Sequence, residues 1–64
     1  MFAEFNCNGK KMLFNAEKIK YIEENKDGNA TIWDVNGCCH NLDHSYLEVK
    51  ESLFTRIEGD ENGN

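Results

Sequence analysis

Two Asn-Gly pairs, Asn8-Gly9 and Asn36-Gly37, constrain the fold of this chain more than any other feature. Each pair stands between runs in which apolar and polar residues alternate, as they do in a strand with one buried face. A two-residue type I′ turn needs positive φ at both central positions, which Asn and Gly tolerate best. The sequence therefore predicts two β-hairpins. Because the chain contains no proline, its turns must be built from Gly, Asn and Asp.

A two-residue loop also fixes which residues face each other across each hairpin. The expected pairs are Cys7–Lys10, Phe5–Met12 and Ala3–Phe14 in the first hairpin, and Val35–Cys38, Trp33–His40 and Thr31–Leu42 in the second. With these registers, one face of each hairpin is largely apolar and can cover a core.

The segment between the hairpins fits two structures. Asn15 is a suitable N-cap for a helical turn over residues 16–18. From there on, the spacing of Ile19 and Ile22 fits a helix, whereas the alternation over residues 20–23 fits a strand. We favour a strand over 19–24 that pairs antiparallel with residues 30–35. A helix remains the alternative to a strand for residues 16–24. The Asp-Gly pair at 27–28 predicts a turn over 25–29.

A helix is predicted near the C-terminus. Ser45 and Glu48 have the spacing of a capping box, in which each side chain bonds the backbone N–H of the other residue. Apolar residues then recur at spacings of three and four, at Tyr46, Val49, Leu53 and Ile57. These signals predict an amphipathic helix over about 46–57, which Gly59 ends.

These elements together predict a single small α+β domain over residues 1–58. It is expected to be an antiparallel β-meander of about five short strands, built on the two Asn-Gly hairpins, with one C-terminal amphipathic helix. A flexible acidic tail is expected over 59–64. A chain of 64 residues buries only about 60% of the surface it exposes when unfolded, so the core should be thin.

Charge and composition narrow the classes of partner. Seven Lys and Arg against twelve Asp and Glu give a net charge of −5, which disfavours direct binding to nucleic acid or to an anionic membrane. No run approaches the roughly 18 apolar residues of a membrane span, so membrane insertion is not expected. Three cysteines are an odd number, and no basic-then-apolar start resembles an export signal. We therefore expect a cytoplasmic protein with free thiols.

The run from Cys38 to His44 is the only local group of metal-type side chains. Cys38, His40 and either Cys7 or His44 could form a zinc site, but paired ligand knuckles are missing and adjacent cysteines on a strand point to opposite faces. A structural role is the preferred hypothesis, with Cys38 in the core and His40 beside Trp33. A catalytic Cys–His pair would need a cleft for which so small a core leaves little room. The prediction is no metal, no cofactor and no enzymatic activity.

A series of features runs along most of the chain, starting with the Asn-Gly turn at 8–9, the apolar strand at 12–14 and the Asn-Ala-Glu run at 15–17. It continues with Ile19, the Ile-Glu pair at 22–23, the second turn at 36–37, a short strand and a helix led by Ser45. In this series the sequence resembles the small FlbD family of flagellar and swarming proteins. The likeness covers about residues 5–55, although the loop at 25–29 is longer here and the strand after the second turn is less basic. The resemblance implies the fold and a motility-related accessory role, and it brings no catalytic residues.

The expected function is that of a small non-enzymatic regulator or accessory factor that acts by protein–protein contact, with self-association left open. The residues expected to bind the partner are Trp33, Tyr21, Tyr46, Glu23, Glu24, Glu48 and Glu51. The alternative is an acidic inhibitor of a host nucleic-acid-binding defence protein. It would be encoded by a phage or mobile element and would mimic nucleic acid as some anti-CRISPR proteins do.

Overall fold

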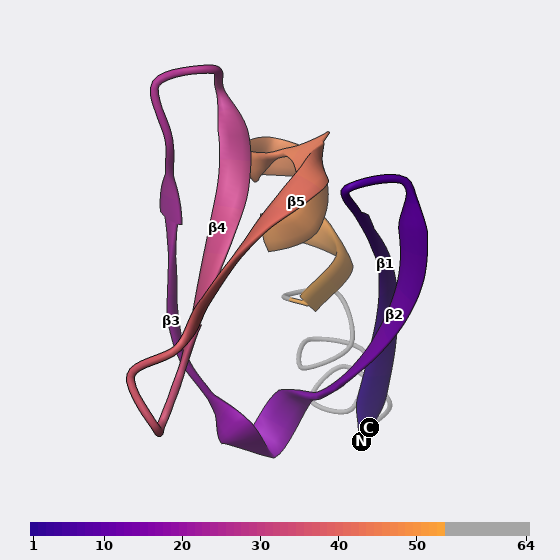
Figure 1. Cartoon of the computed structure of the whole chain (residues 1–64), viewed down its shortest axis with the longest axis vertical. Helices are drawn as coiled ribbons and strands as arrows, with labels where there is room; N and C mark the ends of the chain where they lie inside the picture. Colours follow the sequence, from indigo (N-terminus) through magenta and orange to yellow (C-terminus); the bar gives the residue numbers. More distant parts are fainter. Residues whose placement is uncertain (54–64) are drawn as a thin grey trace, which may run out of the picture.

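The computed structural model describes residues 1–53, which form five antiparallel strands in two sheets followed by a helix (Figure 1). The elements are β1 (Phe2–Cys7), β2 (Lys10–Asn15), the 3-10 turn η1 (Ala16–Lys18), β3 (Ile19–Glu24), β4 (Asn29–Asp34), β5 (Cys39–Ser45) and a C-terminal helix described over 46–53. The α+β class is confirmed. The predicted helix end at residue 57 and the predicted tail over 59–64 lie outside the described residues.

The single meander expected from the sequence is instead split into two sheets. Strands β1 and β2 form one sheet, and β3, β4 and β5 form the other in that order. The split falls at η1, where the Asn15 side chain accepts a hydrogen bond from the Glu17 N–H at 3.1 Å and so caps the turn. The segment over 19–24 is a strand, and the helical alternative for it is wrong.

The first hairpin has the geometry of a two-residue turn. Asn8 and Gly9 both have positive φ, at 53° and 77°. The observed pairs are those expected for such a loop, from Cys7 opposite Lys10 to Ala3 opposite Phe14. Strand β1 therefore alternates cleanly, with its odd-numbered residues buried and its even-numbered residues exposed.

Replacing Gly9 with valine should lower the free energy of unfolding by about 1–2 kcal/mol, the cost of left-handed backbone for a residue with a Cβ. A Cβ added at Gly9 would meet no atom within 4 Å, so the effect comes from φ and not from a clash. Urea denaturation of G9V measures it. The matched control is N36V, because Asn36 also lies in an exposed turn but does not have positive φ. Equal stabilities for the two variants would contradict the prediction.

The second hairpin differs from the prediction by one residue in register. The expected Trp33–His40 pair is wrong, because Trp33 lies opposite Cys39 and Ile32 lies opposite His40. The cause is Asp34, whose Oδ1 accepts from the N–H groups of Asn36 at 2.9 Å and Cys38 at 3.0 Å.

This carboxylate holds a three-residue loop rather than a two-residue one. The Gly37 N–H donates to the Asp34 carbonyl at 3.1 Å, and Gly37 has a φ of 86° at the end of the loop. Asp at the first position of a type I turn and a left-handed Gly at its fourth position are the usual residues for this loop. The extra residue shifts every predicted pair of the second hairpin, including the Val35–Cys38 and Thr31–Leu42 pairs.

The core lies where both sheets and the helix meet. Its buried apolar residues are Ala3, Phe5, Cys7, Ala30, Ile32, Leu42 and Val49. Partly buried side chains pack around them, from Met12, Phe14, Ile19, Ile22 and Leu53. The two sheets thus share one small core, in keeping with the length of the chain.

Side chains, not a backbone ladder, join the outer edge of β1 to β5. The Asn6 N–H donates to His44 Nε2 at 2.9 Å. The Asn8 and Gly9 N–H groups donate to the two carboxylate oxygens of Asp43, at 3.3 Å and 2.8 Å. These contacts give partners to the N–H groups of Asn6, Asn8 and Gly9, which face away from β2.

The start of the helix confirms half of the expected capping box. The Glu48 N–H donates to Ser45 Oγ at 3.1 Å, as predicted. The Glu48 carboxylate does not return to Ser45 but lies 3.3 Å from His44 Nδ1. Because His44 Nε2 accepts the hydrogen bond from Asn6, the proton of the neutral ring is on Nδ1 and faces Glu48.

Candidate protein-binding face

The sheet of β3, β4 and β5 has an inner face that packs on the core and an outer face on the opposite side. Along β4, Ala30 and Ile32 point into the core, so Thr31 and Trp33 point the other way. Residues directly opposite each other across strands share a face. The outer face therefore consists of Tyr21, Glu23, Thr31, Trp33, Cys39 and Asn41.

An aromatic pair occupies one end of the outer face. Tyr21 and Trp33 lie opposite each other on β3 and β4, and their rings stack with centroids 6.0 Å apart at 27°. The Trp33 indole Nε1–H donates to Glu23 Oε2 at 2.9 Å, which fixes the orientation of the ring. Tyr21 remains 47% exposed. The pair thus presents a stacked, amphipathic surface at this end of the sheet.

A row of hydrogen-bonded polar side chains crosses the middle of the outer face. The Thr31 hydroxyl is buried and donates to Asn41 Oδ1 at 2.7 Å. It accepts in turn from Asn25 Nδ2 at 3.4 Å. The row holds the Asn41 amide in place at the surface and connects the aromatic end of the face to the hollow beyond it.

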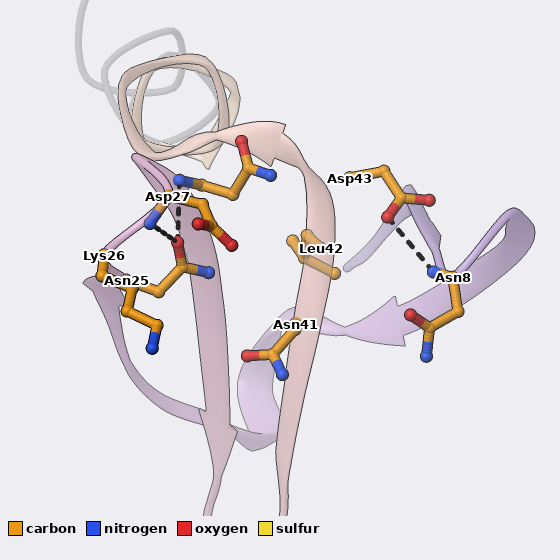
Figure 2. A pocket seen from close by; sticks show the side chains of 8 residues that line it. Asn8, Asn25, Lys26, Asp27, Asn41, Leu42 and Asp43 are labelled. Carbon is orange, nitrogen blue, oxygen red and sulfur yellow. Dashed lines mark hydrogen bonds between the residues drawn. The ribbon is translucent and has the colours of Figure 1, made fainter.

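A polar hollow of about 320 Å³ lies at the other end, between the β3–β4 turn, β5 and the β1–β2 turn (Figure 2). It is lined by Asn8, Asn25, Lys26, Asp27, Asn29, Asn41, Leu42 and Asp43. The Asn25 side chain shapes the turn, because its Oδ1 accepts from the N–H groups of Asp27 and Asn29 at 2.9 Å and 3.1 Å. Amide and carboxylate groups at this end can hydrogen-bond to the backbone or side chains of another protein.

The structure brings together three of the seven residues predicted to bind a partner. Trp33, Tyr21 and Glu23 meet on the outer face. Glu24 follows Glu23 on β3 and is exposed, but its side chain points to the opposite face of the sheet. The other three residues lie on the helix, with Tyr46 half-buried and both Glu48 and Glu51 exposed. The helix packs on the inner side of the sheet through Val49, so the seven do not form one surface.

The cysteines and histidines are spread over different environments. Cys7 is buried, whereas Cys38 and Cys39 are both exposed, so the expectation of Cys38 in the core is wrong. His40 packs edge-on against Phe14, with ring centroids 5.3 Å apart, and not beside Trp33. Among residues 1–53, no three His, Cys, Asp or Glu side chains are grouped so that they could hold a metal ion.

Sequence reasoning missed four contributors to this face: Asn25, Thr31, Cys39 and Asn41. Cys39 and Asn41 were missed because the register of the second hairpin was placed one residue away. Asp34 could have indicated the correct register, because an Asp three residues before a Gly is typical of the three-residue loop observed here. The Asn25–Thr31–Asn41 row depends on this register and on the β3–β4 turn together.

Comparison of the chain with models of protein families, with curated proteins and with solved structures found no match. The interpretation of the outer face therefore rests on its own residues and their geometry. Within the described part of the chain, no helix has the length and apolar character needed to cross a membrane.

Proposed function

We propose that the chain is a small non-enzymatic regulator or accessory factor that binds a protein partner through its outer face. The observation that carries the proposal is the stacked Tyr21–Trp33 pair, in which Tyr21 is exposed, Trp33 is half-buried and the Trp33 indole is held by its hydrogen bond to Glu23. Tyr and Trp are the residues that most often dominate the binding energy of protein interfaces. Because this pair is already ordered, it loses little conformational freedom when a partner binds.

The rest of the outer face supports a protein partner rather than a nucleic acid or a lipid surface. The polar row and the hollow supply amide and carboxylate groups next to the aromatic pair, which is the usual arrangement of an apolar anchor beside a polar rim. The net charge of −5 would repel phosphate groups. A cytoplasmic accessory role of the FlbD-like kind is consistent with such a surface.

A second candidate function is inhibition of a nucleic-acid-binding protein by mimicry of its ligand. The observation that favours it is the set of exposed carboxylates at the turn end of the β3–β4 hairpin, from Glu23, Glu24 and Asp27. If these groups dominate, raising the salt concentration should slow association steeply, because exposed charges are screened beyond about 3 Å at 1 M ionic strength. If the aromatic pair dominates, salt should have little effect.

Replacing Trp33 with alanine should weaken partner binding by at least about tenfold, a loss typical of an aromatic anchor. The measurement is a titration of a captured partner against wild type and W33A at two salt concentrations. The control is L47A, which removes an apolar side chain that is 58% exposed on the helix, away from the outer face. Equal losses for the two variants, or no loss for W33A, would contradict the proposed face.

A further inference from the structure

Within residues 1–53, strand β2 pairs with β1 along one edge and with no strand along its other edge, which lies at the rim of the described part of the molecule (Figure 1). The outer edge of its neighbour β1 is occupied by the side chains of β5, through Asp43 and His44. The other terminal strand, β3, has a bulge between residues 19 and 21, and bulges are a common protection against edge pairing. Strand β2 pairs with β1 without any irregularity. Of the described strands, β2 is therefore the one best suited to pair with a further strand.

The turn geometry shows which amides of β2 face this open edge. In a two-residue hairpin the residues beside the loop form a hydrogen-bonded pair, so Lys10 bonds to β1, as do Met12 and Phe14 after it. The alternate residues of β2, starting with Lys11 and Leu13, direct their N–H and C=O groups outward. The matching alternation on β1 is observed directly, because the Asn6 N–H points away from β2 and bonds to His44.

We propose that two copies of this chain pair through β2, antiparallel, about a twofold axis at Leu13. This register places Leu13 opposite Leu13 of the partner subunit, and Lys11 opposite Asn15 of the partner subunit. It is the register that pairs all the outward-facing backbone groups of β2, at residues 11, 13 and 15. The two sheets of β1 and β2 then join into one four-stranded sheet, through an interface that uses the same surface on both copies.

The side chains of β2 complement each other in this register. Leu13 is 65% exposed in the single chain and meets its own copy at the axis. On the other face Met12 lies opposite Phe14 of the partner subunit, and both residues are half-buried in the single chain. A methionine sulfur beside an aromatic ring is a favourable contact.

The charges of β2 favour the antiparallel arrangement of two copies over the parallel one. The positive charges lie at one end of the strand only, at Lys10 and Lys11. An antiparallel pair places each lysine end beside the uncharged end of the other copy, with Lys11 opposite an asparagine. A parallel pair would set these lysines side by side, and like charges directly opposite each other destabilise a sheet.

This inference is independent of the proposed function. The paired edge belongs to the sheet of β1 and β2, whereas the outer face belongs to the sheet of β3, β4 and β5. Pairing through β2 uses no residue of the outer face, so Tyr21 and Trp33 stay accessible in the dimer. A failure of one proposal therefore leaves the other standing.

Sedimentation equilibrium tests the dimer over about 10 μM to 1 mM, the range in which small interfaces associate. We expect a reversible monomer–dimer equilibrium, whose dissociation constant rises at least about tenfold in L13K because two lysines would meet at the axis. The matched control is L47K, since Leu47 is exposed to a similar extent, at 58%, on the helix. Circular dichroism should show wild-type folding for both variants, because neither side chain belongs to the core.

Amide hydrogen exchange followed by NMR supplies a second, residue-level readout. Protection of the Lys11 and Leu13 amides should rise with protein concentration, whereas the Met12 and Phe14 amides should be protected at every concentration. Any of three results would overturn the proposal: a monomer at all concentrations, a dimer that L13K does not weaken, or concentration-dependent protection along β3 instead of β2. If this edge instead binds a strand from a different protein, the isolated chain would be a monomer at all concentrations.

Discussion

Replacing Ile32 with alanine should lower the free energy of unfolding by about 2–5 kcal/mol, the range for removing a large aliphatic side chain from a packed core. Ile32 is fully buried at the centre of β4 and belongs to the cluster that both sheets and the helix share. Small domains are seldom stable by more than about 3–5 kcal/mol, so a large part of I32A should be unfolded at room temperature.

Urea denaturation followed by circular dichroism measures this effect. I32V keeps most of the volume and should lose only about 0.5–1.5 kcal/mol. V35A is the surface control, because Val35 is 53% exposed, and its stability should stay close to that of wild type. A loss below about 1 kcal/mol for I32A would mean that the shared core does not hold the two sheets together.

Replacing Asp43 with alanine should cost about 2 kcal/mol, at the lower end of the range for hydrogen bonds to a charged group because the site is exposed. Its carboxylate accepts from both N–H groups of the first turn, at Asn8 and Gly9, and so ties that turn to β5. In D43A both N–H groups lose this acceptor. Their amide hydrogens should then exchange faster, and thermal unfolding should begin at a lower temperature.

The matched variant is D43N, which keeps one oxygen acceptor and replaces the other with an amide group that cannot accept. It should fall between wild type and D43A in stability and in the exchange rates of the two amides. Faster exchange over the whole chain, with no preference for Asn8 and Gly9, would contradict the role assigned to this carboxylate.

The elements of the fold could be predicted from local sequence because local chemistry decides them. The Asn8-Gly9 pair permits positive φ at two adjacent positions, and the resulting turn sets the register of the first hairpin. Asn15 caps the 3-10 turn, and Ser45 caps the N-terminus of the helix. The Asn15 and Ser45 side chains each accept a hydrogen bond from a backbone N–H within three residues of their own position.

The division into two sheets could not be predicted in the same way, because it depends on contacts between residues far apart in the chain. Asp43 and His44 bond to amides of the first hairpin that precede them by more than thirty residues. The predicted register of the second hairpin was also wrong, for a specific reason. The Asn36-Gly37 pair suggested a two-residue loop, but Asp34 offers a carboxylate to two N–H groups and stabilises a longer one.

The candidate site was predictable only in part for the same reasons. Tyr21 and Trp33 are both aromatic residues of adjacent strands, and their stacking follows from the pairing of β3 with β4. The predicted carboxylates of the helix, at Glu48 and Glu51, belong to an element that packs on the opposite side of the sheet. No local pattern in the sequence shows on which side of a sheet a following helix will pack.

The fluorescence of Trp33 tests the central claim most directly, because it is the single tryptophan of the chain and lies within the outer face. In a titration of the wild-type protein with its captured partner, binding through this face should bury the indole ring. The emission should then shift to shorter wavelength and become less accessible to a soluble quencher, with a midpoint that matches the dissociation constant from an independent method. Saturating binding that leaves both the emission and the quenching of Trp33 unchanged would show that the partner binds elsewhere.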